Sequence, residues 1–138
     1  MQPTFVSAAR NLAQLDLREG QPEAARGRYV AVLAKDPKLE DASVALAELL
    51  VRTGAPDAEV LKVYDAAVAA NPAAVRSRLG KVAFLTRRGR TKDALEAASQ
   101  AAADLPQDST VLLVLARTQL ANRDATRAAT SFGKLVTL

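Results

Sequence analysis

The sequence repeats a two-helix pattern every 34 or 35 residues, and this period constrains the fold more than any other feature. In the first copy, apolar residues within 12–17 lie on one side of a predicted helix, and Gly20 and Pro22 then interrupt the chain. A second apolar set follows at three- and four-residue spacing, and Pro37 ends the copy. Two such helices cannot bury their apolar sides alone, so each copy must stack on the next. The period therefore predicts an all-α solenoid.

The period divides the chain into a single solenoid domain of four helix–turn–helix repeats with eight helices. The repeats span about residues 4–37, 38–72, 73–106 and 107–138. Helices are expected at 4–19 and 22–35, 39–53 and 57–70, 73–88 and 91–104, and 108–121 and 124–137.

Three of the four expected turns between paired helices contain a glycine. Gly20, Gly54 and Gly89 suit these turns because glycine accepts the left-handed conformation at a helix end. The fourth repeat lacks this glycine. We expect Asn122 to take the left-handed conformation there and Asp124 to cap the following helix.

Recurring pairs of residues carry a resemblance to a known family. The second helices repeat a small residue followed four positions later by an aromatic or small one, in Ala25/Tyr29, Val60/Tyr64, Ala94/Ala98 and Ala128/Phe132. Three first helices contain Leu-Ala, at 12–13, 46–47 and 115–116, whereas the third has Lys81-Val82. This pattern resembles the tetratricopeptide repeat family over the whole chain. The resemblance implies a right-handed α-solenoid that acts as a non-enzymatic scaffold and binds proteins or peptides.

Two segments also resemble a narrower group. LAQLDLREGQPEAARGRYVAVLAKDP and LAELLVRTGAPDAEVLKVYDAAVAANP are similar to the bacterial repeat lipoproteins associated with PEP-CTERM protein sorting and exopolysaccharide production. That resemblance implies an exported parent protein in the periplasm or cell envelope, of which this chain is a fragment of a longer array. Without it, a cytoplasmic location is the alternative.

The composition removes most catalytic chemistry. The chain has no cysteine and no histidine, which excludes thiol nucleophiles, zinc fingers and histidine bases. Gly80-Lys81 lacks the spacing and the hydroxyl residue of a phosphate-binding loop. We therefore expect no enzyme activity, no cofactor and no metal. The longest apolar run, 111–116, is far shorter than the roughly 20 residues of a membrane-spanning helix.

The family resemblance places a partner-binding groove on the exposed side of the first helices, where an extended segment or a helix of a partner would lie. The residues expected to line it are Arg10, Gln14, Arg18, Val44, Glu48, Val51, Arg52, Leu79, Ala83, Arg87, Leu113, Arg117 and Leu120. Arg18, Arg52 and Arg87 recur two residues before each turn glycine. They have two readings: binding of partner carboxylates, or compensation of the negative charge at a helix end.

Charge and the last helix leave further alternatives open. Residues 70–138 contain eleven Lys and Arg against five Asp and Glu. They include the run Arg76, Arg78, Lys81, Arg87, Arg88, Arg90 and Lys92. An acidic protein is the favoured partner, and nucleic acid or another anionic polymer is a weaker alternative. The chain could also be a structural spacer. The apolar final helix, 125–138, has no polar cap and suggests self-association.

Overall fold

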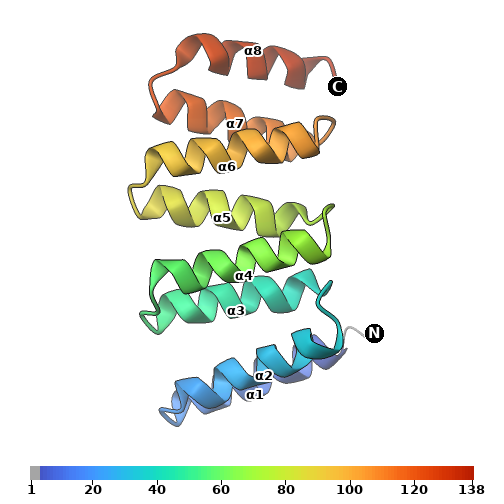
Figure 1. The fold of residues 1–138 in the computed structure, drawn as a ribbon, viewed down its shortest axis with the longest axis vertical. Helices are drawn as coiled ribbons and strands as arrows, with labels where there is room; N and C mark the ends of the chain where they lie inside the picture. The colour runs from blue at the N-terminus through green and yellow to red at the C-terminus, as the bar shows by residue number, and fades with distance from the viewer. Residues whose placement is uncertain (1–3) are drawn as a thin grey trace. The chain divides into compact units, whose positions relative to one another are not determined.

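The structure, a computed structural model, describes residues 4–138, with side chains described from Val6 onward. This part of the chain folds into helices without strands (Figure 1). The helices are α1 (Thr4–Arg18), α2 (Pro22–Lys35), α3 (Glu40–Arg52), α4 (Asp57–Ala70), α5 (Val75–Arg87), α6 (Thr91–Asp104), α7 (Ser109–Ala121) and α8 (Ala125–Val136). Each lies within two residues of its predicted ends, so the predicted all-α fold of helical hairpins is confirmed.

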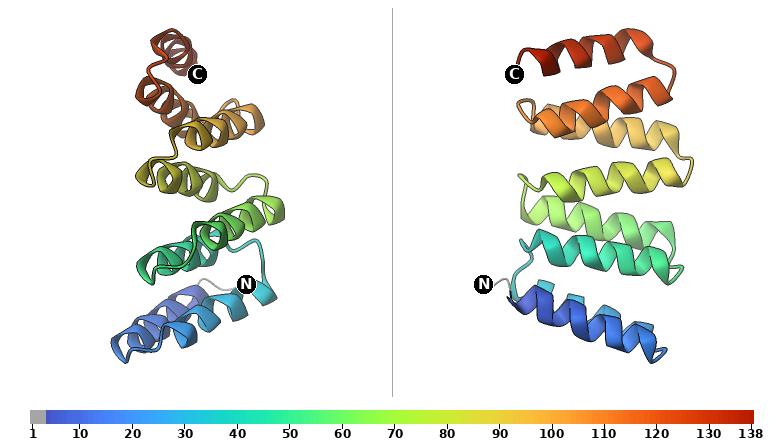
Figure 2. Two further views of the ribbon diagram at one scale, coloured as in Figure 1. Left: turned by 60° about the vertical axis from the view of Figure 1, so that its left-hand side comes forward. Right: turned by 180° about the vertical axis from the view of Figure 1, so that it is seen from behind.

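The chain forms two compact units, Met1–Ser77 and Arg78–Leu138, whose boundary falls inside α5. In the first unit, α1 packs on α2, α2 on α3, and α3 on α4, and α1 also touches α3. Consequently α1 and α3 share one side of this unit and α2 and α4 the other (Figure 2). In the second unit, α6 packs on α7 and α7 on α8.

Alanine builds much of the core. Ala25 and Ala47 are fully buried in the first unit, and Ala116 is fully buried in the second. Such small side chains allow close approach of the helices, and larger residues fill the remaining space. Tyr29 and Tyr64 do so at equivalent positions, with 5% and 3% of their surface exposed.

Two leucines depart from the predicted packing. Leu12 and Leu15 belong to the apolar side of the first repeat, yet they are 43% and 48% exposed. Their counterparts 34 residues later, Leu46 and Leu49, are buried. The reason is positional: the first hairpin packs on α3, whereas no described element covers the corresponding face of α1.

The four turns within the hairpins share one backbone geometry. Gly20, Gly54 and Gly89 have φ values of 73°, 76° and 71°. In the fourth turn Arg123 adopts this conformation with φ 61°, and Asn122 does not (φ −88°), so the prediction for Asn122 is wrong. The Asn122 side chain instead donates hydrogen bonds to the carbonyls of Thr91 and Thr118. The predicted cap is confirmed, because the Asp124 carboxylate accepts from the Arg127 N–H at 3.1 Å.

Polar pairs join the two helices of the first and the last hairpin. The buried Asp16 carboxylate accepts from Arg28 Nε at 2.8 Å and from Nη2 at 3.1 Å. Gln119 Oε1 accepts from Ser131 Oγ at 2.7 Å, and both residues are buried. The equivalent pairs of the two middle repeats are apolar, Leu50 with Val63 and Leu85 with Ala97. The hydrogen bonds from Arg28 lower the pKa of Asp16, although burial opposes this shift.

Candidate partner-binding groove

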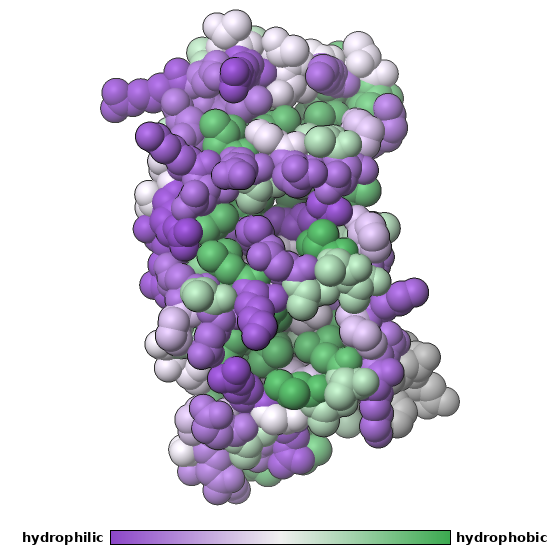
Figure 3. All heavy atoms as spheres, in the orientation of Figure 1, coloured by the Kyte–Doolittle hydropathy of each residue, from purple (hydrophilic) through white to green (hydrophobic). Residues whose placement is uncertain are grey.

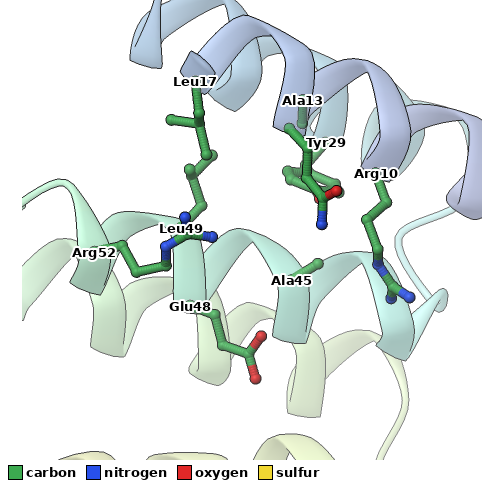
Figure 4. Close-up of a pocket in the computed structure, with 9 residues that line it drawn as sticks. Arg10, Ala13, Leu17, Tyr29, Ala45, Glu48, Leu49 and Arg52 are labelled. Atoms are coloured by element: carbon green, nitrogen blue, oxygen red, sulfur yellow. The ribbon is translucent and has the colours of Figure 1, made fainter. Parts of the chain in front are cut away.

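A small pocket lies between α1 and α3 in the first unit (Figure 4). It encloses about 90 Å³. Its walls come from three helices and comprise Arg10, Ala13, Gln14, Leu17, Tyr29, Ala45, Glu48, Leu49 and Arg52. Four of these, Arg10, Gln14, Glu48 and Arg52, are among the predicted groove residues. The structure thus brings them together at one place.

A second hollow, of about 370 Å³, is lined by Gln14, Leu17, Arg18 and Arg52. Gln14, Leu17 and Arg52 also line the smaller pocket, so the two hollows share a wall. Arg18 and Arg52, which recur 34 residues apart in the sequence, therefore border the same space. Each also lies in the last turn of its helix, where a cation offsets the negative helix end.

The phenol of Tyr29 belongs to the wall of the smaller pocket. Burial raises the pKa of Tyr29 above its ordinary value, and the hydrogen bond and positive charge of Arg10 and the charge of Arg52 partly oppose this increase. Glu48 acts in the same direction as burial. The pocket therefore combines one polar hydroxyl with two cations and a single carboxylate.

The arginines of the first unit divide into two groups. Arg26, Arg28 and Arg76 each form an ion pair, with Glu59, Asp16 and Asp41 respectively. Within residues 6–138, Arg18 and Arg52 form no ion pair with a carboxylate. Arg10 likewise forms no ion pair with a carboxylate there, and its positive charge acts on the Tyr29 hydroxyl. The three groove arginines thus remain available to an anionic ligand.

The other predicted groove residues are distributed differently. Val44 is only 9% exposed, so it packs in the core and is not available to a partner, contrary to prediction. Val51, which lies two turns later on the same helix, is partly exposed. The remaining residues lie in the second unit, where Leu79 and Leu113 are partly exposed and the others are exposed: Ala83, Arg87, Arg117 and Leu120.

The basic run of the sequence is less available than its composition suggests. Arg76 pairs with Asp41, which lies 35 residues earlier. Arg78 is buried and pairs with Asp104 at 2.7 Å, and Arg90 pairs with Asp93 at 2.8 Å. The basic run is therefore a weaker anion-binding candidate than its sequence suggests, because acidic residues distant in sequence or just beyond the run neutralise three of its charges. The Arg88 guanidinium lies 5.2 Å from the ring centroid of Phe84, which is buried.

The sequence reasoning missed a larger apolar groove between α2 and α4, floored by α3. It encloses about 590 Å³, and apolar atoms gather in this hollow (Figure 3). Its lining includes Val30, Leu33, Leu46, Leu50 and Val63. The spacing of Val30 and Leu33 could have predicted this groove, because these two apolar residues lie beside the core positions of α2 rather than on them.

The described residues contain no cluster of acidic side chains that could hold a metal ion. None of the helices α1–α8 has the length and apolar character needed to cross a bilayer.

A family model described as "Tetratricopeptide repeat" matches residues 10–75 and 85–137. Several solved structures share the fold. A tetratricopeptide repeat protein from Parabacteroides merdae aligns with a TM-score of 0.58 and 20% identity over 96% of this chain and 51% of its own. For MamA from Desulfovibrio magneticus RS-1 the TM-score is 0.60, with 20% identity over 96% and 75% of the two chains.

PilF from Pseudomonas aeruginosa aligns with a TM-score of 0.64 and 24% identity over 97% of this chain and 61% of its own. The chain therefore spans about half the length of the Parabacteroides protein. No curated protein matches it. At these identities the solved structures support the fold alone.

Proposed function

Because the chain belongs to the tetratricopeptide repeat family, whose repeats generally mediate protein–protein interaction, we propose that its first unit captures an acidic segment of a partner protein between α1 and α3. One observation supports the proposal most directly. Arg10, Arg18 and Arg52 line this groove without a carboxylate partner among the described residues, whereas the other arginines of the unit are paired.

The dimensions and lining of the two hollows suit different parts of such a segment. A water molecule occupies about 30 Å³ in the liquid, so the pocket of about 90 Å³ accepts a group of a few atoms, such as one carboxylate. Arg10, Gln14, Arg52 and the Tyr29 hydroxyl supply hydrogen-bond donors around it. The adjacent hollow of about 370 Å³ has room for a side chain, with Leu17 as an apolar wall.

Guanidinium groups give the groove its selectivity. A planar guanidinium can donate two parallel hydrogen bonds to one carboxylate, which a lysine cannot do. Glu48 is the only acidic residue in the lining of either hollow, so a neutral or basic segment would gain little there.

The test compares two arginines of the first unit that are both on the surface. Fluorescence anisotropy would follow a labelled extended peptide rich in Asp and Glu, with the Asn and Gln version as its control. Arg52→Ala should weaken binding of the acidic peptide by about 10- to 100-fold, since charged hydrogen bonds contribute about 1.5–3 kcal/mol. Arg76→Ala removes the same charge outside the groove and should have a much smaller effect. Equal losses in the two variants would reduce the interaction to net charge and contradict the proposal.

The same assay addresses the alternatives. A nucleic-acid binder would prefer short DNA or RNA to the acidic peptide and lose affinity steeply with salt; the ion pairs of Arg76, Arg78 and Arg90 weigh against it. A structural spacer would bind neither ligand. A role in exopolysaccharide export stays a prediction from sequence resemblance. Arg87 holds the equivalent position in the second unit and extends the proposal to an anion contact there.

A further inference from the structure

Two hairpin turns of the second unit lie next to each other at one edge of that unit. They join α5 to α6 and α7 to α8 (Figure 1). The Asn122 side chain of the second turn donates a hydrogen bond to the Thr91 carbonyl, just after the first turn, at 3.2 Å. Residues 88–93 and 122–127 contain two carboxylates and five cations. We call these cations the basic edge: Arg88, Arg90, Lys92, Arg123 and Arg127.

The two carboxylates neutralise only part of the basic edge. Each pairs with one cation near its own turn, at 2.8 and 3.4 Å respectively: Asp93 with Arg90, and Asp124 with Arg127. Lys92 and Arg123 are exposed and form no ion pair among the residues that the structure describes. These two cations therefore remain open to an anion outside the chain.

The turn geometry itself does not require cations at these positions. The turns of the first unit have the same positive φ at their glycines, yet Glu19 stands at the position of Arg88. Likewise, Glu23 stands at the position of Lys92. Acidic side chains are therefore compatible with this backbone, and the excess of cations is specific to the turns of the second unit.

Arg123 provides a second observation, from its backbone. It has φ 61°, at the position where the other three turns have glycine. The left-handed conformation costs a non-glycine residue free energy, and no ion pair of the Arg123 side chain within the described residues offsets that cost. Strained backbone conformations concentrate at functional sites. Contact of this guanidinium with an external anion explains why the turn has arginine and not glycine.

We propose that the basic edge docks the second unit on a bilayer surface rich in anionic phospholipids. A flat layer of phosphate groups can reach the tips of two neighbouring turns at once. Clusters of four to eight Lys and Arg bind anionic lipid headgroups by this kind of attraction. The proposal goes beyond capture of an acidic segment in the first unit and does not depend on it.

The residue types at the edge favour a lipid surface over nucleic acid. Residues 88–93 and 122–127 contain no aromatic side chain that could stack on bases, and the ring beside Arg88, that of Phe84, is buried. The same stretches contain no large apolar residue that could insert between lipids. Docking is therefore electrostatic, and it should weaken as salt concentration rises.

Cosedimentation with large unilamellar vesicles tests the proposal. At low salt the unaltered chain should bind vesicles of equimolar phosphatidylglycerol and phosphatidylcholine, and should not bind vesicles of phosphatidylcholine alone. Lys92→Ala should lower the partition coefficient about fivefold, which is the contribution of one cation near an anionic surface.

The matched control is Lys134→Ala. Lys134 is exposed and belongs to α8, nine residues from the start of that helix. At the helical rise per residue it lies about 13 Å from the turn, which exceeds the Debye length of about 8–10 Å at moderate salt. Lys134→Ala removes the same charge as Lys92→Ala and should have a much smaller effect at that salt concentration.

Substitutions of Arg123 separate charge from stability. Arg123→Gly relieves the backbone strain and Arg123→Ala retains it, yet both should lower vesicle binding about fivefold, because both remove the charge. A loss of binding by the more stable glycine variant cannot come from unfolding. Arg123→Lys keeps the charge and should bind nearly as well as the unaltered chain.

Four results would overturn the proposal. The first is an unaltered chain that binds neither type of vesicle, or both types equally. The second is an equal loss from Lys134→Ala and Lys92→Ala. The third is an Arg123→Gly chain that binds as well as the unaltered one. The fourth is displacement of the chain from the vesicles by short duplex RNA at the same phosphate concentration, which would assign the edge to nucleic acid instead.

Discussion

Replacing Arg123 by glycine should stabilise the second unit. Among the described residues, Arg123 is the single non-glycine residue with positive φ, and the three equivalent turns all have glycine there. The left-handed conformation costs a non-glycine residue about 1–2 kcal/mol. Glycine removes that cost but adds about 0.4–1 kcal/mol of conformational entropy to the unfolded chain. The net gain should be about 0.5–1 kcal/mol.

The structure indicates that little else changes with this substitution. The Arg123 side chain is exposed and forms no ion pair with the residues that the structure describes. The backbone bonds that close the turn, from Arg123 N–H to the Leu120 carbonyl and from Asp124 N–H to the Gln119 carbonyl, are both 2.9 Å and do not involve a side chain. Glycine can form both of them.

Thermal unfolding followed by circular dichroism measures the gain. With an unfolding entropy of about 2.1 cal/mol/K per residue, the midpoint should rise by about 2–3 °C if the whole chain melts together, and by more if the second unit melts alone. Arg123→Ala retains the backbone penalty and should change the midpoint little. Gly89→Ala, whose added Cβ would meet no neighbour, should lower stability by about as much as Arg123→Gly raises it. An Arg123→Gly chain no more stable than Arg123→Ala would refute the reasoning.

The polar pairs give two further predictions. Ser131→Ala leaves the buried Gln119 oxygen without its donor and should reduce the free energy of unfolding in urea by about 1–3 kcal/mol; adding Gln119→Leu, as at Leu85, should recover most of the loss, and no recovery would contradict this account. Because the pKa of Asp16 is lower in the folded chain, its contribution to stability is fully present above its ordinary value of 3.8 and lost as pH falls through the lower folded value. Denaturation at a series of acidic pH values should therefore show a steeper loss for the unaltered chain than for Asp16→Asn.

Local chemistry and the repeat period were enough to predict the helices and three of the four turns. A glycine at the turn position predicts positive φ, since few other residues take it, and this holds for Gly20, Gly54 and Gly89. The fourth turn could not be read in this way. Repeat phase puts Arg123, 34 residues after Gly89, at the glycine position, but asparagine takes positive φ more readily than arginine, so residue type favoured Asn122.

The groove illustrates the same limit. Repeat phase predicts which residues share a face, and it placed Arg10, Gln14, Glu48 and Arg52 around one pocket. It does not predict how deeply the neighbouring repeat covers each position, so Val44 is buried although it has the phase of exposed Arg10. Ion pairs between residues far apart in the sequence, such as Arg76 with Asp41, likewise cannot be predicted from a short stretch of sequence.

The alanine core also shapes how this protein can evolve. Fully buried alanines such as Ala25, Ala47 and Ala116 have only a methyl group to lose, and truncation to glycine costs about 1 kcal/mol. Enlargement is the greater hazard, because extra methylene groups in a close-packed interior cost about 1–3 kcal/mol and push the helices apart. Substitution of these alanines by a smaller residue should therefore be tolerated, and substitution by a larger residue should not. The reverse holds for a protein whose interior is filled by leucine and phenylalanine.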